Sequence, residues 1–88
     1  MTKAYEAIQR LLESDMANSD HVIIMSPQVR NSMPNEERMM ISEIATSLGI
    51  QIHVDRLIER DRVLIMKRDF YEEQARERKA NRDLRIVK

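Results

Sequence analysis

The segment from Met33 to Leu48 constrains the fold of this chain more than any other. Its apolar residues recur at intervals of three and four, as along the buried face of an amphipathic helix. Glu36 and Glu37 fall in the first turn, where carboxylates favour the positive end of the helix dipole. Gly49 stands where a helix usually ends. The segment therefore predicts a helix whose buried face consists of Met40, Ile41, Ile44, Ala45 and Leu48.

Three short segments have the character of β-strands. Residues 21–25 are rich in β-branched side chains and apolar on both faces, which predicts a strand between neighbours or under a helix. Residues 50–54 alternate apolar and polar side chains, as a half-buried strand does, and residues 62–67 predict a third strand. We expect the last two strands to form a hairpin. Its loop should be long or bulged, because no Gly or Asn lies between them.

Helices are expected at both ends of the chain. Thr2 is a suitable N-cap for a helix that reaches Ser14, followed by a polar connection over residues 15–20. Residues 28–32 are expected to be a loop that carries Arg30. Asp69 is placed to cap a last helix, whose later positions are almost all charged.

The element order is thus α-β-α-β-β-α. Residues 1–68 are expected to form a compact α+β domain, with a small three-stranded sheet and helices packed on one face. Residues 69–88 are expected to form a charged C-terminal helix or tail.

Composition excludes several classes of protein. The 88 residues suffice for one domain, and only 3% of them are aromatic. Without cysteine there can be no disulfide framework or thiolate nucleophile, which favours a reducing compartment. The first residues lack the apolar core of a signal peptide and no apolar run could span a membrane, so we expect a cytoplasmic protein. The single glycine rules out a glycine-rich phosphate loop, and no nucleophile–base motif occurs, so neither an enzyme nor a cofactor is expected.

Charge is distributed unevenly along the chain although the formal net charge is zero. Residues 1–55 contain 4 basic and 8 acidic side chains, whereas residues 56–88 contain 11 basic and 7 acidic ones. Such asymmetry predicts a local basic patch. The ordinary alternative is a solvated surface of mixed charges.

Several motifs together resemble a known family. They are Pro34 to Arg38 at the start of the central helix, Glu43 and Ala45 within it, Leu48-Gly49-Ile50 at its exit, and the final strand Arg62 to Lys67. This pattern, over roughly residues 4–68, resembles the family of single-stranded nucleic-acid-binding domains named for an Arg-x-x-x-His motif. Arg38 matches the motif arginine, and Ser42 occupies the position of the motif histidine. The resemblance implies binding of single-stranded RNA or DNA, with Arg38 as the central phosphate contact.

The candidate binding residues are mainly basic side chains. Arg38 and Ser42 lie one turn apart on the expected helix and are therefore neighbours. Alternatively, Arg38 pairs with Asp55 or Glu37, or is simply solvated. His21 and His53 lack the spacing of metal ligands, so no metal site is expected. The full candidate set is Arg38, Ser42, Arg30, His53, Arg56, Arg62, Lys67 and Arg68.

A second hypothesis has a different basis. If Met39, Leu57 and Ile58 are exposed, they provide an adaptable apolar patch for a protein partner or a homodimer. The chain would then be a small adaptor or inhibitor, of a size common among phage regulators, that keeps the fold without binding nucleic acid.

Overall fold

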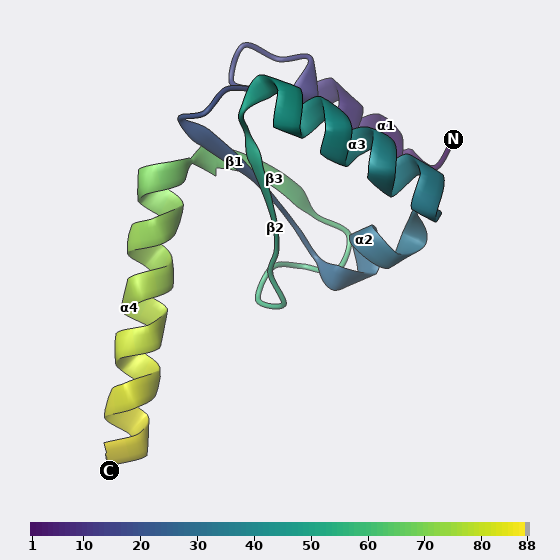
Figure 1. The fold of residues 1–88 in the computed structure, drawn as a ribbon. Coiled ribbons are helices and arrows are strands. Elements are labelled where there is room, and N and C mark those ends of the chain that lie inside the picture. Colours follow the sequence, from purple (N-terminus) through teal and green to yellow (C-terminus); the bar gives the residue numbers. More distant parts are fainter. Residues whose placement is uncertain (88) are drawn as a thin grey trace.

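The structure is a computed structural model that describes residues 1–87, and for residues 78–87 only the backbone. Four helices and three strands follow one another along the chain (Figure 1). They are α1 (Lys3–Leu12), β1 (His21–Met25), α2 (Pro27–Ser32), α3 (Asn35–Leu48), β2 (Gln51–Val54), β3 (Val63–Lys67) and α4 (Arg68–Val87). The predicted α+β fold with one three-stranded sheet is confirmed, with one additional helix in the order.

The sheet has the order β2-β1-β3, with β1 in the centre. β2 runs parallel to β1, and β3 runs antiparallel to it. The predicted hairpin is therefore wrong, because the segment between β2 and β3 crosses from one edge of the sheet to the other. The central place of β1 follows from its sequence, since a strand that is apolar on both faces is most stable between two neighbours and under a helix.

Helices α1 and α3 cover one face of the sheet (Figure 1). As predicted, the Thr2 side chain caps α1, which ends two residues earlier than expected. The buried face of α3 differs from the prediction, because Ile44 is 36% and Leu48 39% exposed. Glu37, Ile41 and Ala45 are the buried residues of α3, so its inward face is rotated towards Glu37. The core beneath the helices consists of Tyr5, Ile8, Leu12, Ile23, Met25, Val29, Met33, Ile41, Ala45 and Ile50.

The segment before α3 is helical, although we predicted a loop there. The Ser26 hydroxyl accepts a hydrogen bond from the Val29 backbone N–H, and Pro27 occupies the first helical turn. A Ser-Pro pair can thus both end a strand and begin a helix, because serine is a good N-cap and proline fits the first position.

The opposite face of the sheet is covered differently. Val22 and Ile24 of β1 are almost fully buried there, beside the first turns of α4. The rings of His53 and Tyr71 lie with centroids 5.0 Å apart. Asp69 is not the N-cap of α4, because this helix begins at Arg68 directly after β3. The Arg68 backbone N–H donates instead to the Asp20 carbonyl at 2.8 Å.

Candidate nucleic-acid interface

A hollow of about 260 Å³ opens between α2, α3 and the ends of β1 and β2. Its polar lining consists of three residues that the sequence singled out, Arg30, Arg38 and Ser42. Below, we call this cavity the basic hollow. Its remaining lining is apolar and consists of Met25, Met33, Ile41, Ile52 and Val54.

Arg38 is held in a defined position at this hollow. Its Nη2 donates a hydrogen bond to the side-chain oxygen of Asn35, one turn earlier in α3. Its Nε is buried and has no hydrogen-bond partner. An unsatisfied donor on a charged group is costly, and this buried Nε becomes accessible to an acceptor only when the Arg38 side chain moves.

The pairing of Arg38 with Glu37 that we considered as an alternative is not the one observed. Glu37 is only 5% exposed, and its carboxylate accepts hydrogen bonds from the backbone N–H of Thr2 at 2.9 Å and from the Thr2 hydroxyl at 3.0 Å. Glu37 therefore joins α3 to the start of α1 instead of neutralising Arg38. The carboxylate nearest in sequence to Arg38 is thus already used.

Arg30 reaches the basic hollow because α2 is a helix. The carbonyl of Ser26 accepts from the Arg30 backbone N–H at 3.2 Å, which closes the first turn. In an extended loop, the direction of Arg30 would not be fixed. The sequence feature that indicates the helix α2 is the pair Ser26-Pro27 before a short polar segment.

The chain was compared with family models, with curated proteins and with solved structures. None of these comparisons found a match. The relation to the Arg-x-x-x-His family stays a prediction from the sequence pattern.

The other basic candidates are divided between the two ends of the sheet. At one end of the sheet, Met25 of β1 is in register with Val54 of β2 and with Val63 of β3. Residues 55–62 therefore connect β2 and β3 at this end, where the basic hollow also lies. Arg56 and Arg62 belong to this connection, and Arg62 forms an ion pair with Glu59 at 3.4 Å. Lys67, at the opposite end of β3, pairs in register with His21. Lys67 is thus about 13 Å from Val63 along β3. Lys67 and Arg68 therefore lie at the other end of the sheet from the basic hollow and do not form one patch with Arg38.

His53 points to the other face of the sheet. Its register partner is Ile24, and its Nε2 lies 3.2 Å from the side-chain oxygen of Gln51. The basic hollow instead includes Ile52 and Val54, whose side chains alternate with His53 along β2. The structure therefore does not bring His53 and Arg38 together.

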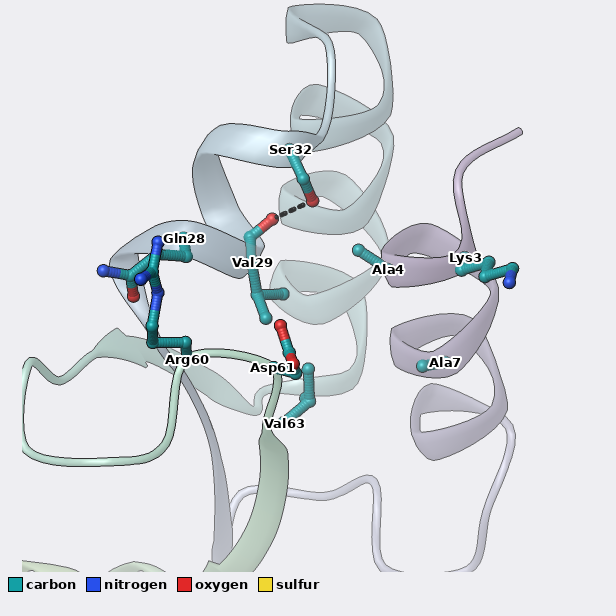
Figure 2. A pocket seen from close by; sticks show the side chains of 9 residues that line it. All are labelled: Lys3, Ala4, Ala7, Gln28, Val29, Ser32, Arg60, Asp61 and Val63. Carbon is teal, nitrogen blue, oxygen red and sulfur yellow. Dashed lines mark hydrogen bonds between the residues drawn. The ribbon is translucent and has the colours of Figure 1, made fainter.

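A second cavity, of about 440 Å³, was not expected from the sequence. Figure 2 shows Arg60 beside Gln28 at one side, Lys3 at the other, and Asp61 between them. Its apolar lining consists of Ala4, Ala7, Val29 and Val63. Because Asp61 offsets the two cations, this cavity is a poorer place for a phosphate than the basic hollow.

Residues 1–87, which the structure describes, lack both a cluster of metal ligands and a membrane-spanning helix. No group of three or more His, Cys, Asp or Glu side chains is arranged to hold a metal ion in this part of the chain. Within the same residues, no helix combines the length and the apolar character needed to cross a bilayer.

Proposed function

We propose that this chain is a non-catalytic module that binds single-stranded RNA or DNA through the basic hollow. The observation that carries the proposal is that Arg38, Arg30 and Ser42 line one hollow, in which no acidic side chain takes part. We place this activity in the cytoplasm, in keeping with the cysteine-free sequence.

The chemistry of the basic hollow suits a phosphate next to an apolar group. Guanidinium groups offer several N–H donors in one plane and bind phosphate oxygens well, and Arg30 lines the same cavity. The exposed hydroxyl of Ser42 is a further donor one turn from Arg38. Arg56 lies in the connection between β2 and β3, at the same end of the sheet.

Affinity should be modest and depend little on sequence. Single-strand binders usually stack bases on aromatic side chains, but the lining of the basic hollow contains none. Phosphate contacts therefore supply most of the binding, and the affinity must fall as salt is added.

The test is fluorescence anisotropy with a labelled single strand, RNA and DNA in turn, at two salt concentrations. Arg38→Ala should weaken binding about tenfold, because a charge-assisted phosphate contact is lost. It should also reduce the slope of log affinity against log salt by about 0.7. Arg10→Ala removes an exposed arginine of α1 and serves as the matched control, with binding unchanged. Equal binding by the Arg38→Ala and wild-type proteins would refute the proposal.

A second function is favoured by a separate observation. Met39 is 63% and Leu57 67% exposed, and Ile58 is half-buried. These residues could form the contact of an adaptor or inhibitor with a protein partner. A chain that binds no single strand at low salt, but whose binding to a partner is lost in Leu57→Ser, would support this function over the first.

A further inference from the structure

Strand β2 is a short edge strand that contains neither a charged residue nor a proline. It has a neighbour, β1, on only one side. Edge strands commonly carry lysine, proline or a bulge that prevents pairing with another strand. The four residues of β2, Gln51–Val54, contain no charged residue and no proline, whereas β3 ends in Lys67.

The backbone of β2 presents free groups at its outer edge. The Asp55 N–H donates to the Met25 carbonyl of β1 at 2.9 Å. Successive residues of a strand direct their backbone N–H and C=O groups to opposite sides. The backbone N–H and C=O groups of Gln51 and His53 therefore also point towards β1. Ile52 and Val54 therefore direct their N–H and C=O groups outwards.

Space for another strand exists beside this edge. A groove of about 420 Å³ lies between α3 and β2 and is lined by Ser42, Ala45 and Thr46 of α3 and by residues 50–53. The side chains from α3 are all small, so the helix leaves the edge of β2 uncovered.

We propose that β2 pairs antiparallel with β2 of a second copy of this chain, around a twofold axis at Ile52. The two Ile52 residues then exchange a pair of N–H···O=C hydrogen bonds, as their outward direction allows. Each Val54 N–H donates to the Ile50 carbonyl of the other copy. The two sheets join into one continuous sheet of six strands.

The side chains of β2 are complementary to themselves in this register. Gln51 of each copy lies opposite His53 of the other, and these two types of side chain already contact each other within one chain. Val54, which is 45% exposed, lies opposite residue 50 of the other copy and loses part of its exposure beside the second strand. Because the strand is uncharged, no like charges meet across the axis. A second copy therefore fits this edge. Because Ser42 and Ile52 line both the groove and the basic hollow, strand pairing and nucleic-acid binding share part of one surface.

Cross-linking tests the register directly. Gln51 and His53 of opposite copies form a non-hydrogen-bonded pair, with Cα atoms about 4.5 Å apart, which suits a disulfide. The native chain has no cysteine, so Gln51→Cys and His53→Cys introduce the only thiols. On oxidation, a mixture of the two variants should give a covalent heterodimer, and each variant alone should give little covalent dimer. Equal cross-linking in the mixture and in the single variants, or none in any of them, would overturn the proposal.

Sedimentation equilibrium provides the second measurement. Val54→Pro removes the outward N–H of Val54 from each copy and leaves the hydrogen bonds to β1 intact, so the dimer dissociation constant should rise about tenfold or more. Val54→Thr keeps the N–H and the branched shape and should dimerise like the wild type. Circular dichroism of each variant verifies that it is folded. A wild-type chain that stays monomeric up to about 1 mM would overturn the proposal, and the groove would then suit an extended peptide of another protein.

Discussion

At the scale of single residues, Glu37 is the one charged residue that is buried in the described part of the chain. Its carboxylate is buried and accepts two hydrogen bonds from Thr2, the residue that also caps α1. Removing it leaves donors of Thr2 unpaired and separates the start of α1 from α3. We therefore predict that Glu37→Ala lowers the free energy of unfolding by about 2 kcal/mol, measured by urea denaturation.

The neighbouring Glu36 provides the control for this prediction. It lies in the same turn but is exposed, so Glu36→Ala should change stability by less than about 0.5 kcal/mol. Glu37→Gln keeps an acceptor oxygen and should fall between the two. If Glu37→Ala is as stable as Glu36→Ala, the contact with Thr2 does not join the helices.

Gly49 is the second residue with a defined conformational role. Its φ is +78°, in the left-handed region that glycine adopts without strain, and it ends α3. A Cβ there would lie 3.6 Å from the Cβ of Ser19, which is ordinary contact, so strain in the backbone dominates the cost. We predict that Gly49→Ala lowers the free energy of unfolding by about 1 kcal/mol, and Gly49→Asn by less. Thermal unfolding would measure both, and equal losses would contradict the conformational explanation.

At the scale of elements, the start of α2 is joined to the β2–β3 connection by the buried hydroxyl of Ser26. Ser26 is fully buried, accepts from the Val29 N–H at 3.1 Å and donates to the carbonyl of Arg60. It therefore fixes the start of α2, which carries Arg30, and the connection between β2 and β3. We predict that Ser26→Ala costs about 2 kcal/mol of stability and weakens single-strand binding as well.

Ser32, at the end of α2, is the matched control. Its hydroxyl donates to the Val29 carbonyl at 2.7 Å, but the residue is exposed, so Ser32→Ala should lose less than about 0.5 kcal/mol. Comparable losses in both variants would show that Ser26 has no special part in the junction.

The sequence predicted the elements better than their arrangement. Residues 21–25 were assigned correctly, because a short run of β-branched residues has few alternatives. The hairpin was wrong because strand pairing depends on which strand is apolar on both faces, and adjacency in sequence does not decide this. The end of α3 at Gly49 could be predicted from the sequence. The burial of Glu37 could not, because its partner Thr2 lies 35 residues away in the chain.

For the candidate site, the sequence identified the residues but only part of their geometry. Arg38 and Ser42 were expected to be neighbours from helical spacing, and both line the basic hollow. Arg30 joins them only through the unpredicted helix α2. Lys67 and His53 are separated from Arg38 by the register of the sheet, which cannot be derived from a list of basic residues.

At the scale of the whole molecule, the two faces of the sheet are covered unequally. Two helices, α1 and α3, cover one face, whereas α4 contacts the other through β1 and β3 and then extends away from the body (Figure 1). Leu64 and Met66 of β3 are accordingly only half-buried. The first turns of α4, with Tyr71 beside His53, should therefore contribute to stability, and the projecting part should not.

Two truncations test this division of α4. A chain that ends after Glu77 keeps the turns that contact the sheet, so its free energy of unfolding should lie within about 0.5 kcal/mol of that of the whole chain. A chain that ends after Lys67 uncovers Val22 and Ile24, which are now 0% and 1% exposed, and should lose about 2 kcal/mol or more. Urea denaturation measures both.

Residues 78–88 add a net charge of +4 from five basic and one acidic side chain, so their removal should weaken single-strand binding at low salt while stability is unchanged. If both properties fell together after truncation at Glu77, the projecting half would be part of the folded domain and not a separate basic arm.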